Sequence, residues 1–154
     1  MALCGIVAHV YGVHMMSMDA SQLISSYEQA VASIDVDGLL ELYADHVRVF
    51  DGTSAWQYPS KDEWRAAVVE WFGYLSGNGV CEIREPRVAG SDDLVVICGL
   101  AFYAADDRQG GRAEIVSRFT QVWEPGDGGP RITHEHTSLP LDDQCQHPLP
   151  QPTT

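Results

Sequence analysis

Basic residues are scarce in this sequence. Of its 154 residues, 9 are lysine or arginine and 22 are aspartate or glutamate, so the formal net charge is -13. A field of that sign repels nucleic acids and anionic lipids. We therefore expect neither a nucleic acid nor a membrane as a partner. A neutral or cationic small molecule, or another protein, is easier to accommodate.

Long hydrophobic runs are absent as well. No stretch of the sequence is long enough to span a membrane. A secretory signal begins with lysine or arginine and ends in a small-residue cleavage site. The apolar segment 1–13 contains neither basic residue, and no such site follows it. We interpret residues 1–18 as an N-terminal extension. Three alternatives stay open: an extra strand, a flexible arm, or a start assigned upstream of the true initiating methionine.

Cysteine is rare and scattered. Cys4, Cys81, Cys98 and Cys145 include no pair at metal-ligand spacing. This pattern argues against a zinc site and against a dense disulfide framework. Cys98 lies in an apolar run and is expected to be a small buried residue. The sequence therefore predicts a reducing, cytoplasmic compartment.

Helical periodicity is present in the first half of the chain. Apolar residues recur at helical spacing over 19–34, and Tyr27 lies on the apolar face. A short second helix is predicted over 39–43. A third helix is predicted over 60–76, where Ser60 begins a capping box.

The second half has the periodicity of strands. We predict strands over 80–88, 93–104, 113–123 and 131–139, separated by short turns that contain glycine or aspartate. Such short connections make neighbouring strands antiparallel. Helices followed by an antiparallel meander predict an α+β fold, with three helices on one face of a curved sheet and an apolar pocket between them. The proline-rich tail, 142–154, is predicted to be mobile.

A short strand over 45–51 lies between the second and third helices. Val47, Val49 and Asp51 share one of its faces, and Gly52 follows as a turn residue. A carboxylate that ends an apolar strand is a candidate general base, because apolar walls raise its pKa toward neutrality. The alternative is an aspartate that only initiates the turn.

Two stretches of the chain resemble a known superfamily. The first runs from Tyr27 through Asp35-Val-Asp-Gly and Leu42-Tyr-Ala-Asp to Asp51, and the second comprises Thr120-Gln-Val-Trp, Asp127-Gly and His134-Glu-His-Thr-Ser. They are similar to the nuclear transport factor 2-like superfamily, which includes ketosteroid isomerase, the SnoaL-type polyketide cyclases and the association domain of calmodulin-dependent protein kinase. The resemblance covers residues 19–141 and implies a cone-shaped α+β domain that encloses a pocket.

The resemblance to ketosteroid isomerase implies roles for two residues. Its opening aligns without a gap, so that Tyr27 falls on the oxyanion-hole tyrosine and Asp51 on the proton-shuttling aspartate of that enzyme. The second oxyanion-hole acid falls near Phe119, which cannot donate a hydrogen bond. The oxyanion hole is therefore incomplete, and steroid isomerase activity itself is not expected.

Either of the two faces of the last predicted strand could line the pocket. Glu135 and Thr137 lie on one face, and His134 and His136 lie on the other. In the kinase association domain the position that matches Thr137 resembles a pocket-lining one, which favours Glu135 inside. With the opposite parity, the histidines become an acid and base near neutral pH. The two histidines could also bind a metal, but no third ligand stands at a suitable spacing, so we predict none.

Five side chains form the predicted substrate-binding set. Trp56 and Tyr58 lie in the loop after the short strand and are candidates for the pocket mouth, and packing against the third helix is the alternative. Phe119 and Gln121 lie on the more apolar face of their strand, which we turn inward. Thr137 completes the set.

The predicted function is acid–base chemistry, without a cofactor, on a small apolar molecule that carries a carbonyl group. Asp51 moves a proton at carbon, Tyr27 stabilises the oxyanion, and Glu135 or a histidine is the partner acid. The SnoaL-type resemblance implies an isomerase, cyclase or dehydratase of secondary metabolism. The alternative is a non-catalytic ligand-binding or oligomerisation domain. We expect a homodimer through the outer face of the sheet, because an exposed apolar sheet face is rarely left bare.

Overall fold

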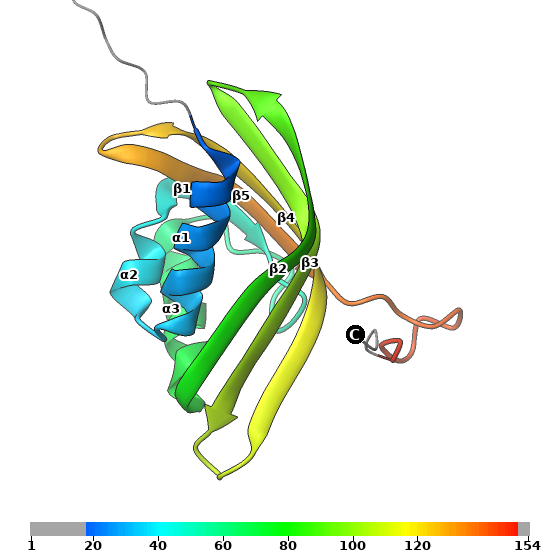
Figure 1. Ribbon diagram of the computed structural model, residues 1–154. Coiled ribbons are helices and arrows are strands. Elements are labelled where there is room, and N and C mark those ends of the chain that lie inside the picture. The colour runs from blue at the N-terminus through cyan, green and yellow to red at the C-terminus, as the bar shows by residue number, and fades with distance from the viewer. Residues whose placement is uncertain (1–17, 151–154) are drawn as a thin grey trace, which may run out of the picture.

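Three helices lie in the hollow of a strongly curved sheet (Figure 1). The computed structural model describes residues 18–150, so most of the predicted N-terminal extension lies outside the described residues. The elements, in chain order, are α1 (Ala20–Ala32), α2 (Val36–Leu40), β1 (Tyr43–Phe50), α3 (Lys61–Gly73), β2 (Leu75–Ser91), β3 (Leu94–Asp107), β4 (Arg112–Gly126) and β5 (Gly129–Ser138). The predicted α+β architecture is confirmed.

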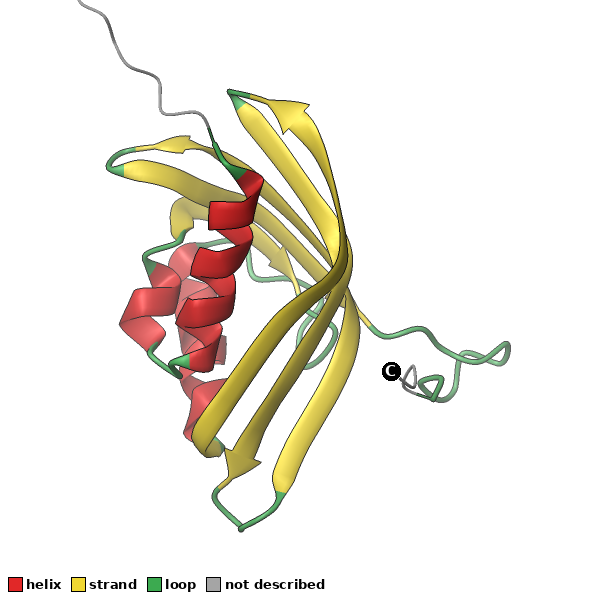
Figure 2. Cartoon of the chain, viewed as in Figure 1, coloured by secondary structure: helices red, strands yellow, loops and turns green. Residues whose placement is uncertain are grey.

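The sheet has the strand order β1-β5-β4-β3-β2. Strands β2 to β5 form the predicted antiparallel meander, which curves around the helices in Figure 2. Strand β1 pairs in parallel with β5, the last strand in the sequence, with Val49 beside Glu135 and Phe50 beside His136. This pairing brings the end of β1, and Asp51 after it, next to the acid-bearing part of β5.

Side-chain caps fix where the two long helices begin. The carboxylate of Asp19 accepts a hydrogen bond from the backbone N–H of Ser21, and the hydroxyl of Ser60 accepts one from Glu63. Such caps satisfy backbone donors that have no partner within the helix. The starts of α1 and α3 therefore agree with the predicted ones. Helix α3 ends at Gly73, earlier than predicted, because the chain continues as β2 from Leu75.

The second helix ends earlier than predicted, which changes the role of one residue. Helix α2 stops at Leu40, and Tyr43, which was predicted to be helical, is the first residue of β1. It pairs with Ile132 of β5 and is completely buried. The sheet pairing overrides the local helical preference of this short segment.

The core lies between the helices and the concave face of the sheet. Each large apolar side chain that is fully buried there contributes about 1.5–3 kcal/mol to stability. The largest such residues are Trp123, Tyr43, Leu39, Leu40, Ile97 and Ile132. No helix within residues 18–150 has the length and hydrophobicity needed to cross a membrane.

Helix α1 and strand β2 meet at a glycine. A Cβ atom on Gly79 would overlap the carbonyl oxygen of Ala32, at the C-terminal end of α1. Only glycine permits so close an approach of two backbones. This contact fixes the helix that carries Tyr27 against the sheet.

Candidate active site

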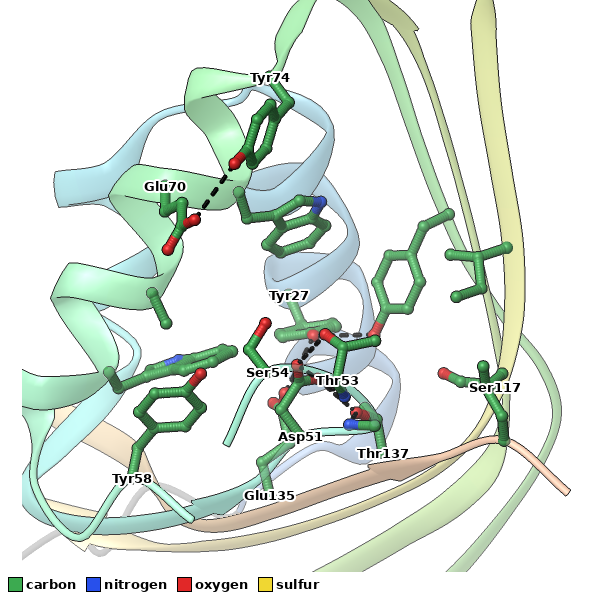
Figure 3. A pocket seen from close by; sticks show the side chains of 17 residues that line it. Tyr27, Asp51, Thr53, Ser54, Tyr58, Glu70, Tyr74, Ser117, Glu135 and Thr137 are labelled. Carbon is green, nitrogen blue, oxygen red and sulfur yellow. Dashed lines mark hydrogen bonds between the residues drawn. The ribbon is translucent and has the colours of Figure 1, made fainter. Parts of the chain in front are cut away.

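A pocket of about 340 Å³ opens between the helices and the sheet. Its walls come from α1, α3, the loop after β1 and the inner faces of β3, β4 and β5 (Figure 3). Of the residues predicted for the site, it contains Tyr27, Asp51, Tyr58, Glu135 and Thr137. Its volume lies at the lower end of the range of small-molecule sites.

Glu135 is the buried acid of this pocket. Its side chain is 2% exposed. Its Oε2 accepts a hydrogen bond of 2.7 Å from the hydroxyl of Tyr43 and one of 2.6 Å from Nε2 of Gln121. The indole of Trp123 donates to Oε1 of Gln121 over 2.9 Å. Because an indole N–H can only donate, this bond orients the amide so that its NH₂ group faces Glu135.

The second carboxylate oxygen of Glu135 is held less tightly. Its nearest donor is the hydroxyl of Tyr27 at 3.5 Å, and that hydroxyl lies 3.1 Å from the hydroxyl of Tyr103. Since both strong donors engage Oε2, the proton of the neutral acid belongs on Oε1. Oε1 is therefore the atom of Glu135 that can give or take a proton.

Burial controls the protonation of these groups. Removal from water raises the pKa of Glu135 to about 7, and the negative charge of Asp51 acts in the same direction. The hydrogen bonds from Gln121 and Tyr43 lower this pKa but do not outweigh burial. Burial and the charge of Glu135 also raise the pKa values of Tyr27, Tyr43 and Tyr103 well above their usual range. Near neutral pH the acid thus exchanges protons readily, while the tyrosines remain hydrogen-bond donors.

Asp51 lies at the end of β1 and faces the same pocket. Its Oδ1 accepts from the hydroxyl of Thr137 over 2.7 Å, and its Oδ2 accepts from the hydroxyl of Thr53 over 2.9 Å. Thr137 in turn accepts from the backbone N–H of Gly52 at 3.1 Å. The aspartate therefore lines the pocket and anchors the turn, while its predicted use as a general base stays a prediction.

The parity of β5 places the two histidines outside the pocket. Because successive strand residues face opposite sides, Glu135 and Thr137 point inward while His134 and His136 point outward. Nδ1 of His134 lies 2.9 Å from the carbonyl oxygen of Arg48. The histidines therefore cannot be the acid and base of this pocket, which was the use predicted for the opposite parity.

Trp56 and Tyr58 separate although they lie in the same loop. Tyr58 pairs with Val49 of β1 and lines the pocket, where its ring lies 5.2 Å from that of Trp64. This pairing turns the intervening residues outward, so Trp56 is 98% exposed. It does not line this pocket, in contrast to its predicted place at the mouth.

Phe119 and Gln121 point inward as predicted but lie beneath the pocket. The ring of Tyr27 lies 5.4 Å from that of Phe119, and Glu135 covers Gln121. Neither residue lines the pocket, because Tyr27 packs against Phe119 and Glu135 lies over Gln121. The predicted contacts of Phe119 and Gln121 with a substrate are therefore not available in this structure.

Sequence reasoning missed several residues of the site. Tyr43 is predicted in a helix, and Tyr103 lies in a strand of which only the apolar pattern is interpreted. Ser117 shares the inward-turned face of Phe119 and Gln121 but is not among the predicted site residues. The sequence does contain a signal for Tyr103. It lies two residues after the buried Ala101 in an apolar strand, so both side chains face the same side of the sheet. Trp71 of α3, which was not predicted for the site, also lines the pocket.

The site contains no cluster of metal ligands. Within residues 18–150, no three histidine, cysteine, aspartate or glutamate side chains lie close enough together to hold a metal ion. The polar groups that face the pocket are instead carboxylates and hydroxyls, which suit proton transfer and hydrogen bonding to an oxygen atom.

Comparison with known proteins gives consistent similarities. The family model of the SnoaL-like domain matches residues 20–142. No curated protein matches the chain. Among solved structures, an NTF2-like protein of unknown function from Pseudomonas putida KT2440 is 28% identical, covers 87% of this chain and 93% of its own, and has a TM-score of 0.75.

Two more distant structures share the fold alone. A proposed calcium/calmodulin-dependent protein kinase II association domain from Xanthomonas campestris is 21% identical, with 77% of this chain and 83% of its own covered and a TM-score of 0.68. A proposed dehydratase of the NTF2-like family from Streptomyces avermitilis is 12% identical, with 77% and 91% covered and a TM-score of 0.65.

Proposed function

Because the chain belongs to the SnoaL-like domain family, we propose that it is a cofactor-independent enzyme that moves a proton on a small, mostly apolar molecule with a carbonyl group. The family includes isomerases, cyclases and dehydratases. The observation that carries the proposal is the buried carboxyl of Glu135, which lines the pocket and has a pKa of about 7. A carboxyl tuned in this way suits a general acid or base at neutral pH.

The tyrosines supply the partner for the carbonyl oxygen of the substrate. If Tyr27 donates to the oxygen of Tyr103, the proton of Tyr103 is free to bind that carbonyl oxygen. Oε1 of Glu135 then takes a proton from the adjacent carbon, and the negative charge moves to the oxygen that Tyr103 stabilises. The neutral carboxyl returns the proton to carbon in an isomerisation or to a departing hydroxyl group in a dehydration.

Asp51 acts in this proposal through its charge. It lines the pocket, and its negative charge raises the pKa of Glu135. Glu135, which is the more deeply buried of the two acids, therefore takes the part of proton carrier that the sequence had suggested for Asp51. The hydroxyls of Thr137 and Thr53 hold the aspartate in place.

The decisive experiment measures isomerisation of a β,γ-unsaturated cyclic ketone in D₂O by proton NMR. Glu135→Gln keeps the shape of the neutral acid and removes the base, so we expect the rate to fall by roughly 100-fold or more. Glu124→Gln, a carboxylate outside the pocket, is the matched control and should react like the wild type. Equal rates for wild type and Glu135→Gln would overturn the proposal.

The alternative function is a binding or oligomerisation domain without catalysis. Its support is the fold similarity to a kinase association domain. A pure scaffold is expected to fill its cone with side chains such as Phe50, Leu100, Phe102 and Phe119. Phe119 is buried in the core, but a cavity of about 340 Å³ remains and none of the four side chains lines it. Tight ligand binding without any exchange at carbon would favour this alternative.

We also infer a homodimer that pairs through the outer face of the sheet. Phe50 lies there with its ring 5.3 Å from His134 and 5.8 Å from His136, and the Arg84 guanidinium lies 4.1 Å above the Phe102 ring. An exposed face with such aromatic groups suits a symmetric contact. Light scattering after size-exclusion chromatography tests this inference, and a clean monomer would remove it.

A further inference from the structure

A second cavity, of about 250 Å³, adjoins the first. Trp71, Tyr103 and Ile115 line both cavities, so these three side chains form the wall between them. The second cavity is lined by residues around the end of α1 and from β2, β3 and β4. In Figure 1 these three strands extend past α1 toward the lower end of the molecule.

The lining of the second cavity is almost entirely apolar. Small side chains create the space, because Ala105 of β3 pairs with Ala113 of β4 and both line the cavity. Ile34 also lines this cavity, and its backbone has a φ of 54°. A β-branched residue rarely adopts a positive φ, and this strain is tolerated where the surrounding structure imposes it. The cavity therefore suits a hydrocarbon group.

Strand β4 connects the two cavities along one face. Ser117 lines the first cavity, Ile115 lines both and Ala113 lines the second. At about 3.3 Å per residue, Ser117 and Ala113 lie roughly 13 Å apart. The hydroxyl of Ser117 is buried and has no hydrogen-bond partner among the described residues. A buried unpaired hydroxyl is unfavourable unless a ligand satisfies it.

These observations define a track with a polar and an apolar end. We propose that the two cavities form one elongated site for a neutral molecule with an oxygen-bearing head and a hydrocarbon tail. The head binds near Glu135 and Ser117, and the tail passes Ile115 into the second cavity. Trp71 or Tyr103 must shift to admit the tail, and Tyr103 is the more restrained because its hydroxyl is bonded to that of Tyr27. The inference rests on the proposed function for the position of the head.

The test is a series of methyl ketones whose alkyl tails grow from propyl to octyl, with binding measured by isothermal titration calorimetry. In the wild type, each methylene that enters the second cavity should tighten Kd by about threefold to fourfold. Ala113→Phe places a ring in that cavity from an exposed position of β4. It should bind the propyl ketone normally and the octyl ketone at least tenfold more weakly.

Matched variants control for folding and for general surface effects. Ala89→Phe adds the same ring to an exposed strand position outside both cavities, so it should bind every ketone like the wild type. Val80→Phe fills the second cavity from β2 and should reproduce the effect of Ala113→Phe.

Two outcomes would overturn the inference. One is an affinity that does not depend on tail length, and the other is equal binding of the octyl ketone by Ala113→Phe and Ala89→Phe. Deuterium exchange at the α-carbon of the propyl ketone is measured in parallel and tests the proposed function separately. A dependence on tail length without exchange would refute catalysis while supporting the elongated site.

Discussion

At the scale of single residues, the two oxygens of Glu135 have different surroundings. Oε2 accepts two short hydrogen bonds from Tyr43 and Gln121, whereas Oε1 has only the long contact to Tyr27. Hydrogen bonds to the ionised form lower its pKa, and burial raises it. Burial is the larger effect and raises the pKa of Glu135 to about 7.

This raised pKa predicts how stability depends on pH. The folded state holds a proton on Glu135 that the unfolded chain releases above its ordinary pKa of 4.5, so stability should fall as pH rises from about 4.5 to about 7 and then level off. The full loss is roughly 3 kcal/mol. Urea unfolding at several pH values measures it, and Glu135→Gln should lack this component. An identical pH profile in both proteins would contradict the burial of an ionisable carboxyl here.

Two neighbours of Glu135 should shift its pKa in opposite directions. Asp51→Asn removes a negative charge that raises this pKa, so the pKa should fall. Tyr43→Phe removes a hydrogen bond to the carboxylate, so the pKa should rise. Carbon-detected NMR titration of Glu135 follows both changes. Shifts in the same direction would mean that the charge effect of Asp51 or the hydrogen bond from Tyr43 is absent in solution.

Ser117 should behave as a binding residue with no structural duty. Because its hydroxyl has no partner, Ser117→Ala should change the free energy of unfolding by less than about 0.5 kcal/mol. The same substitution should weaken binding of an oxygen-bearing ligand by roughly five- to tenfold, the value of one hydrogen bond. A hydrocarbon of matching shape should bind both proteins equally. A clear loss of stability would show that the hydroxyl has a partner within the protein.

At the scale of elements, the contact between α1 and β2 supports the site. Gly79→Ala would press a methyl group against the carbonyl of Ala32. We expect a loss of about 1–3 kcal/mol in the free energy of unfolding, as in other overpacked contacts. Gly73→Ala, at the end of α3 with nothing within 4 Å of the added Cβ, is the control and should be neutral or slightly stabilising. Urea denaturation compares the two variants, and equal stabilities would refute the close contact.

The sequence contained most of the information on the elements. The alternation of apolar residues predicted the strands, and the parity that turned Phe119 and Gln121 inward is confirmed by their burial. Local pattern could not assign Tyr43, because a residue next to a short helix takes its conformation from a strand almost ninety positions away. The same limit applies to Trp56 and Tyr58, which only the pairing with β1 separates.

At the scale of the whole molecule, the site combines residues from distant parts of the chain. Tyr27, Asp51 and Glu135 come from α1, the end of β1 and β5, and they meet only because β5 lies between β1 and β4. Each of the three could be predicted as a site residue from its neighbours in the sequence and from the family resemblance. The sequence could not rank Asp51 against Glu135, because the difference is one of burial, which depends on the complete fold.

The position of β5 also has a consequence for how the chain acquires its structure. This strand is the last of the sheet in the sequence, yet within residues 18–150 it is the one strand of the sheet that lies beside β1. Strand β1 can therefore pair within the sheet only after nearly the entire domain has been synthesised. Contacts of such long sequence separation make folding slow. The acid-bearing strand is thus the piece that completes the sheet, and a chain interrupted before it has neither a closed core nor the carboxyl on which the proposed chemistry depends.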